Sequence, residues 1–118
     1  MSHVKIKRYE RDVPITLHST TSLATTMRLD DMAGGVVTLG TMNTNSATLQ
    51  MWGGNSVDGS FGRLYNADGS ASDITLSPSS TQGRIYALPD AVFALPFLKI
   101  VSGATNSTGT TGIVSLKS

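Results

Sequence analysis

The sequence predicts an all-β domain: an antiparallel, jelly-roll-like β-sandwich with eight or nine short strands and an extended N-terminal arm. Ser, Thr, Gly and Asn make up 47 of the 118 residues, and these residue types disfavour helices because they compete with the helical backbone or cost entropy. Short apolar segments of period two are interrupted by turn signals roughly every 8 to 12 residues, which is the spacing of sandwiches and barrels. The length is that of one domain.

Residues 1–12 form the predicted arm, and residues 13–118 form the predicted sandwich domain. Six of the 17 charged residues lie in this arm: Lys5, Lys7, Arg8, Glu10, Arg11 and Asp12. Fully extended, twelve residues reach roughly 40 Å, far beyond the radius of such a domain, so the arm is long enough to contact a neighbouring molecule. The alternative is that these residues form a first strand or a frayed tail.

Eight segments of the domain carry a strand pattern. They span residues 13–17, 36–39, 48–52, 61–65, 74–76, 84–88, 97–101 and 113–116. The Ser- and Thr-rich residues 18–26 are a candidate edge strand, and Asp58-Gly59 and Asp68-Gly69 are typical of hairpin turns. Residues 89–95 predict a single helical turn ended by Pro96, which we expect to be a crossover at one end of the sandwich.

Residue types that perform enzyme chemistry are scarce, and no enzymatic activity is expected. The chain has no cysteine and two histidines, His3 and His18, which is too few ligands for a zinc site. Asp30 and Asp31 are adjacent, so on a strand they would point to opposite faces. Motifs for phosphate binding or for a nucleophilic serine are missing from the sequence. We therefore predict no catalytic residue, no cofactor and no metal.

Residues 66–73 place oxygen-bearing side chains at alternating positions, as a calcium loop does. No glutamate closes this pattern. The preferred interpretation is a hairpin turn in which Asn and Asp side chains accept hydrogen bonds from backbone amides.

The formal net charge of +1 and the sequence pI of about 8.1 do not indicate nucleic-acid binding by the whole domain. Duplex binding through the basic arm is a weaker alternative, which would show a steep salt dependence. The longest apolar cluster, residues 91–98, contains Pro96 and is shorter than the ~20 residues of a membrane helix. Since the basic N-terminus has no apolar stretch after it, no signal peptide is recognised, and synthesis in a cytoplasm without a membrane partner is expected.

Strand alternation predicts which side chains leave the core. In residues 48–52, Leu49 and Met51 share one face, and Trp52 lies on the other. The same reasoning places Leu64, Ile85 and Ala87 in the core and Tyr65 and Tyr86 on the outer face, beside Arg63 and Arg84. Aromatic residues and Arg are enriched at protein interfaces. The alternative is a strand parity shifted by one residue, with Trp52 in the core.

From residue 61 onward the chain resembles a known group of proteins. The segments GRLYNADGSASDITLS, GRIYALPDAVFALPFLKIVSGA and GIVSLKS resemble small β-sandwich virion proteins of tailed bacteriophages. The shared pattern is a strand ending in Tyr, an Asp-Gly turn, an Ile-Thr-Leu strand, an Ala-Leu-Pro corner, a Phe-Leu-Lys-Ile strand and a terminal strand. This resemblance covers roughly residues 32–118 and consists of strands and turns without a catalytic signature.

The resemblance implies an auxiliary head protein that decorates or cements the capsid. It would bind the major capsid protein as a homo-oligomer, with a trimer favoured, on the capsid surface of the virion. The expected contact residues are Lys5, Lys7, Arg8 and Arg11 of the arm, together with Trp52, Tyr65 and Tyr86 of the body.

Two alternatives belong to other functional classes. The first is a glycan-binding module of a phage tail or fibre, in which Trp52, Tyr65 and Tyr86 stack on sugar rings and Asn55 and Asp58 bind hydroxyls. The second is a tail or neck completion protein, which would form a sixfold or twelvefold ring.

Overall fold

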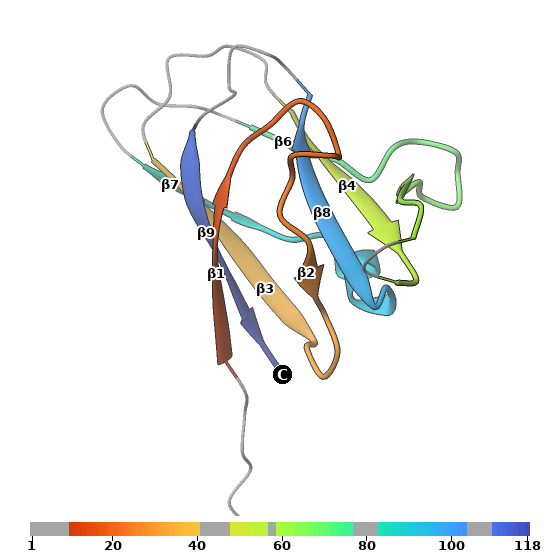
Figure 1. The fold of residues 1–118 in the computed structure, drawn as a ribbon, viewed down its shortest axis with the longest axis horizontal. Helices are drawn as coiled ribbons and strands as arrows, with labels where there is room; N and C mark the ends of the chain where they lie inside the picture. Colours follow the sequence, from red (N-terminus) through yellow and green to blue (C-terminus); the bar gives the residue numbers. More distant parts are fainter. Residues whose placement is uncertain (1–9, 41–47, 57–58, 77–82, 104–109) are drawn as a thin grey trace, which may run out of the picture.

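Two antiparallel sheets pack face to face, which confirms the predicted all-β sandwich (Figure 1). The computed structural model describes residues 10–40, 48–56, 59–76, 83–103 and 110–118. In the first sheet the strand order is β1 (Glu10–Thr16), β9 (Thr111–Lys117), β3 (Gly34–Leu39) and β7 (Arg84–Ala87). In the second sheet the order is β2 (Met27–Arg28), β8 (Phe97–Ser102), β4 (Thr48–Gly54) and β5 (Gly62–Arg63), and β6 (Ile74–Thr75) also pairs with β4.

The core lies between the two sheets and consists mainly of apolar side chains from alternate strand positions. Leu49 and Met51 of β4 are fully buried, as the sequence predicted. They belong to one cluster with residues of both sheets, including Val37 and Val114 of the first sheet and Leu98 of the second. The alternation along each strand follows from the pleat, which sends successive side chains to opposite faces.

The first strand begins earlier than the predicted domain boundary. Glu10, Arg11 and Asp12, which the sequence assigned to the arm, pair with β9 between Lys117 and Ser115. Charged side chains are accepted here because β1 is an edge strand, where charge is common and limits edge-to-edge pairing. The alternative of a first strand therefore holds for these three residues, and residues 1–9 lie outside the described part.

The candidate edge strand over residues 18–26 is wrong. These residues form turns, and only Met27–Arg28 pair as a strand, with β8. The turns are fixed by hydrogen bonds to β8: the backbone N–H of Ser102 donates to the carbonyl oxygen of His18, and Nζ of Lys99 donates to that of Thr21. Hydroxyl-rich residues favour such local turns over a sheet ladder.

The predicted parity of residues 84–88 is also wrong by one position. Ile85 is 66% exposed and Ala87 is exposed, whereas Leu88 is buried and Tyr86 packs against the core. The register explains this orientation, because Tyr86 lies directly opposite the buried Val37 of β3, and directly paired residues share a face of the sheet.

The predicted helical turn is present as the 3-10 helix η1 (Asp90–Ala94), which connects β7 of the first sheet to β8 of the second (Figure 1). Val92 is completely buried and belongs to the core cluster. The turn ends where the backbone N–H of Leu95 donates to the carbonyl oxygen of Val92 and Pro96 follows. The segment thus has the predicted role of a crossover.

Candidate binding surfaces

Within the described residues, no three side chains of the types His, Cys, Asp or Glu gather as metal ligands. The loop suspected of binding calcium forms a turn whose polar atoms bond to one another. Oδ1 of Asp68 accepts hydrogen bonds from the backbone N–H (2.9 Å) and the hydroxyl (2.6 Å) of Ser70, and Nδ2 of Asn66 donates to the same hydroxyl. These hydrogen bonds, first that of the Ser70 hydroxyl, lower the pKa of Asp68. Gly69 has a φ of 90°, which Gly adopts without strain.

One surface of interest is the outer side of the second sheet. We call it the aromatic face and define it by Gln50, Trp52, Phe61, Arg63, Tyr65, Asp73 and Lys99. Trp52 stands at its centre, directly opposite Lys99 of β8 on one side and Arg63 of β5 on the other. Because directly paired residues lie on one face, these three side chains form a row across three strands.

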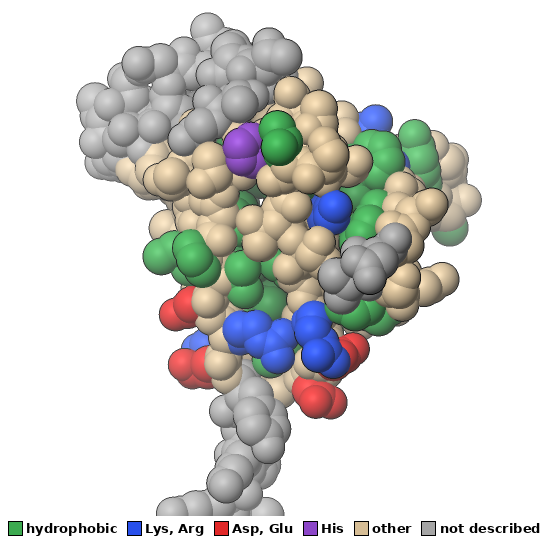
Figure 2. Space-filling view, in the orientation of Figure 1, with side chains coloured by type: hydrophobic (Ala, Val, Ile, Leu, Met, Phe, Trp, Pro, Cys, Tyr) green, Lys and Arg blue, Asp and Glu red, His purple; other side chains and the backbone are tan. Residues whose placement is uncertain are grey.

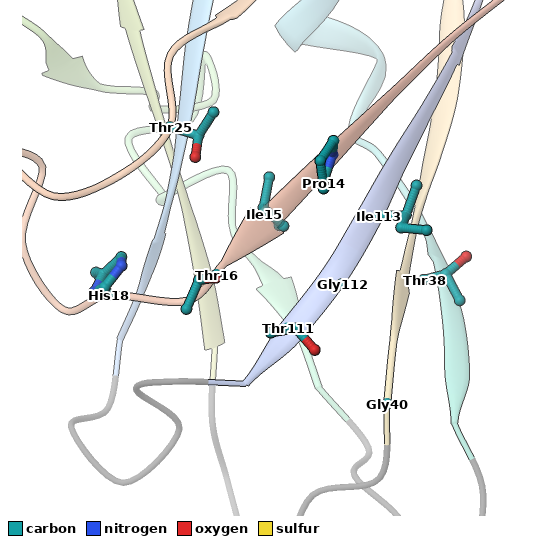
Figure 3. A pocket seen from close by; sticks show the side chains of 10 residues that line it. All are labelled: Pro14, Ile15, Thr16, His18, Thr25, Thr38, Gly40, Thr111, Gly112 and Ile113. Carbon is teal, nitrogen blue, oxygen red and sulfur yellow. The ribbon is translucent and has the colours of Figure 1, made fainter.

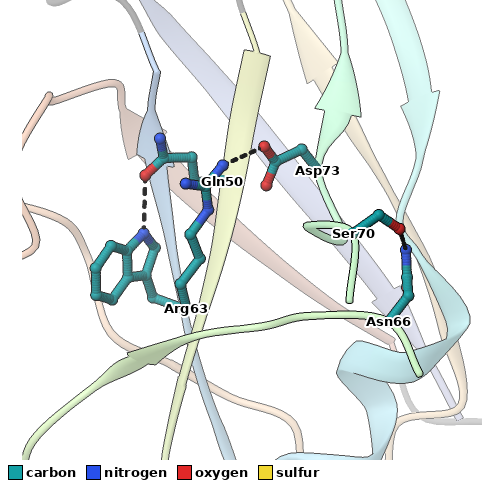
Figure 4. Close-up of polar contacts among 6 residues, drawn as sticks. Gln50, Arg63, Asn66, Ser70 and Asp73 are labelled. Carbon is teal, nitrogen blue, oxygen red and sulfur yellow. Dashed lines mark hydrogen bonds and ion pairs between the residues drawn. The ribbon is translucent and has the colours of Figure 1, made fainter. Parts of the chain in front are cut away.

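Hydrogen bonds hold the side chains of the aromatic face in place (Figure 4). The indole Nε1 of Trp52 donates to Oε1 of Gln50 at 3.1 Å. The guanidinium of Arg63 donates to Oδ2 of Asp73 at 2.5 Å and lies 5.9 Å from the centre of the Tyr65 ring. The hydrogen bond from Arg63 to Asp73 raises the pKa of the guanidinium. Within the described part, Nε of Arg63 and Oδ1 of Asp73 are buried without a hydrogen-bond partner.

Lys99 is a cation without an acidic partner among the described residues. Its Nζ donates to the carbonyl oxygen of Thr21 at 2.9 Å and lies 4.5 Å from the centre of the Phe61 ring. By contrast, Arg28 pairs with Asp30, Arg63 pairs with Asp73, and Lys117 pairs with Glu10. Lys99 is half-buried, so its ammonium is partly desolvated, and no carboxylate of the described ranges neutralises it.

A second surface lies on the outer side of the first sheet. Pro14, Ile113, Thr38 and Ile85 face one another in this order across β1, β9, β3 and β7. We call these four residues the apolar row. All four are exposed, and Ile85 and Ile113 are 66% and 47% exposed. Three of the four side chains are apolar, and Thr38 stands between the two isoleucines. Grouped exposed apolar side chains mark interaction sites more often than scattered ones.

Charged side chains gather at the end of the first sheet where β1 begins (Figure 2), whereas the exposed Arg84 of β7 lies at the opposite end. Glu10 and Asp12 lie at the start of β1, and Lys117 lies beside Glu10 at the end of β9. Next to the apolar row is an open depression of about 610 Å³, lined by Pro14, Thr16, His18, Thr38, Gly112 and Ile113 among others (Figure 3). His18 is thus placed in the wall of this depression.

The structure places the predicted contact residues in different surroundings. Trp52 and Tyr65 lie on the outer face, half-buried and 56% exposed, and Arg63 lies between them. Tyr86 belongs to the other sheet and faces the core, so it is not part of the same platform. Nη1 of Arg11 donates to the carbonyl oxygen of Arg28 at 2.6 Å, which links the two sheets.

Other predicted positions lie apart from this platform or outside the described residues. Asn55 is exposed after the end of β4. Lys5, Lys7, Arg8 and Asp58 lie outside the described residues.

Sequence reasoning missed Lys99 and Asp73 on the aromatic face and Ile85 and Ile113 on the apolar row. Alternation within the segment 97–101 would have placed Lys99 outside the core. The pairing of Asp73 with Arg63 needs two strands that both pair with β4, which no local pattern shows.

No family model, no curated protein and no solved structure matches the chain. Over the described ranges, no helix has the length and apolar character needed to cross a lipid bilayer. The surfaces themselves are therefore the basis for assigning a function.

Proposed function

We propose that this protein is a structural virion protein of a tailed bacteriophage, which decorates the capsid by binding the lattice of the major capsid protein. The observation that carries the proposal is the apolar row, in which Pro14, Ile113 and Ile85 are exposed apolar residues aligned with Thr38 across a four-stranded sheet. Such a surface suits contact with another protein, because apolar area removed from water supplies most of the free energy of association. The phage context rests on the resemblance of residues 32–118.

The strand order supports a jelly-roll form of the sandwich, which is common in capsid domains. If β5 and β6 are counted as one strand, β1 pairs with β9, β2 with β8, β3 with β7, and β4 with the combined strand. A long antiparallel hairpin that folds over into two sheets gives this strand order.

The size of the outer sheet face favours attachment through several weak contacts. Four strands about 4.8 Å apart, with five residues each at about 3.3 Å, present about 300 Å². A stable interface needs about 800 Å² per partner, so one face is too small for a tight isolated complex. A trimer presents three such faces to the lattice, and the contacts then reinforce one another by avidity. Residues 1–9 precede the edge strand of the same sheet and would add contact area.

The test is co-sedimentation of the purified chain with phage heads that lack it. The intact chain should bind saturably, and the double variant Ile85→Asp/Ile113→Asp should bind at least tenfold more weakly, since each charge would be buried unpaired in the contact. Leu23→Asp is the matched control, because Leu23 is as exposed as Ile85 (65% and 66%) but belongs to a turn and not to the strands that carry the row.

A chain starting at Glu10 keeps β1 and measures the contribution of residues 1–9. Absence of binding by the intact chain would reject the proposal. Equal binding by the double variant and the Leu23→Asp control would reject the apolar row as the contact.

A further inference from the structure

We propose that the aromatic face is a binding site for a carboxylated sugar, with the sugar ring stacked on Trp52 and its carboxylate bound by Lys99. This site lies on the opposite sheet from the apolar row and does not depend on the proposed capsid contact.

The first argument is the fixed orientation of the indole. The bond from Nε1 of Trp52 to Gln50, two residues earlier on the same face, holds the ring edge against the strand. Trp52 is half-buried, so part of its surface remains open. The C–H groups on one side of a sugar ring pack on such an aromatic surface, and a ring that is already immobilised loses little entropy on binding.

The second argument is the planar polar groups around the ring. The amide of Gln50 uses its oxygen for Trp52 and keeps its two N–H donors. Arg63 and Asp73 hold each other through a single N–H···O bond from Nη2. Since Nε of Arg63 is buried, the guanidinium would bind a ligand through its Nη groups. Planar side chains of this kind bind neighbouring hydroxyl groups through paired hydrogen bonds. Tyr65, exposed beside Arg63, extends the aromatic surface.

The third argument is charge, which distinguishes an acidic sugar from a neutral one. On this sheet, Arg63 is neutralised by Asp73 and Arg28 by Asp30. Among the described residues, the half-buried Lys99 contacts a carbonyl oxygen and the Phe61 ring and no carboxylate. A partly desolvated cation gains most from an anion, and Lys99 stands directly opposite Trp52. The ligand should therefore carry a carboxylate next to the ring that stacks.

The same reasoning separates a sugar from an acidic peptide. Lys99, Trp52 and Arg63 span two strand spacings, about 10 Å, and a single uncompensated cation lies at one end. An acidic peptide would be attracted by this cation alone, whereas a sugar acid also uses the indole surface and the hydroxyl-binding groups.

The experiment uses the full chain, in which Trp52 is the only tryptophan. Its fluorescence is titrated with tetragalacturonate, with the methyl ester of tetragalacturonate and with tetraglutamate. We expect saturable quenching by tetragalacturonate, with the ester bound roughly tenfold more weakly because it keeps the rings but loses the charge. Tetraglutamate should not quench. A second comparison, of 3′-sialyllactose with lactose, tests the contrast between a carboxylated and an uncharged sugar for another type of sugar acid.

Two variants assign the effect to residues, with affinity measured by calorimetry and folding checked by thermal unfolding. Lys99→Gln should lose roughly tenfold in affinity for tetragalacturonate and should not distinguish it from its ester. Lys117→Gln is the matched control, since Lys117 is an exposed lysine of the other sheet paired with Glu10, and it should bind as the unchanged protein does. Absence of binding by every sugar acid would overturn the proposal, as would equal binding of tetraglutamate or equal losses in both lysine variants.

Discussion

Two adjacent glycines of β3 face opposite sides of the first sheet and should respond oppositely to a single methyl group. A Cβ atom added at Gly35 would lie 2.7 Å from the carbonyl oxygen of Ser115 and 2.9 Å from Cδ2 of Leu116. A Cβ atom added at Gly34 would meet nothing within 4 Å. Both glycines pair with β9, so the two variants probe one strand pair and differ in the space available.

The magnitudes follow from these contacts. At Gly35 the new methyl group would press on the backbone of β9, which can yield only if the ladder shifts, and over-packing of this kind costs roughly 1–3 kcal/mol. At Gly34 the alanine restricts the unfolded chain without strain, which stabilises by roughly 0.4–1 kcal/mol. The free energies of unfolding of Gly35→Ala and Gly34→Ala should therefore differ by roughly 1.4–4 kcal/mol.

The assay is urea unfolding followed by the fluorescence of Trp52, with thermal unfolding as a second probe. A domain of this size shifts its Tm by roughly 4 °C per kcal/mol, so the two variants should melt roughly 6 to 16 °C apart. If Gly35→Ala is as stable as Gly34→Ala, β9 does not lie where the core alternation of β3 puts it, and the register of the first sheet is refuted.

Three further outcomes are expected. Leu88→Ala should cost roughly 2–5 kcal/mol because it leaves a cavity in the core, whereas Ile85→Ser should change the unfolding free energy by less than about 0.5 kcal/mol; the reverse order would restore the parity first predicted for β7. Asp73→Ala leaves the guanidinium of Arg63 without its acidic partner and should cost roughly 1–2 kcal/mol, while the double variant Arg63→Ala/Asp73→Ala should cost less than the sum of the single variants in a double-mutant cycle. The folded-state pKa of Asp68 is lowered by its hydrogen bonds to Ser70. The turn is therefore fully stabilised above the ordinary pKa of Asp, and it loses this contribution as the pH falls through the lowered value. The amide resonance of Ser70 should shift with this titration, and Asp68→Ala should abolish the shift.

The sequence was most informative where a strand has one buried and one exposed side over several residues. Residues 48–52 are such a case, because Leu49 and Met51 are aliphatic whereas Thr48 and Gln50 on the other face are polar, and the predicted faces are confirmed. The turn at Asp68-Gly69 was equally clear, since the dipeptide itself determines the geometry. Local residue chemistry sufficed in both places.

The prediction failed where the outcome depends on a distant strand. In residues 84–88 both alternating sets contain apolar side chains, so Ile85 and Tyr86 were equally plausible core residues, and the pairing of Tyr86 with Val37 decides between them. Glu10, Arg11 and Asp12 have the composition of a solvated tail. They nevertheless belong to the edge strand β1, whose seven residues all pair with β9. Strands of two residues, such as β2 and β5, are too short to carry a period of their own.

The arrangement of the two surfaces follows directly from the architecture. Two sheets pack about 10 Å apart and bury their inner faces against each other, so each sheet has one outer face and these faces point in opposite directions. The apolar row occupies one outer face and the aromatic face occupies the other. A partner bound to the row would therefore leave Trp52 and Lys99 accessible, and neither contact would require the sandwich to deform. If both proposals hold, the domain is a rigid connector that attaches on one side and presents a sugar-binding surface on the other.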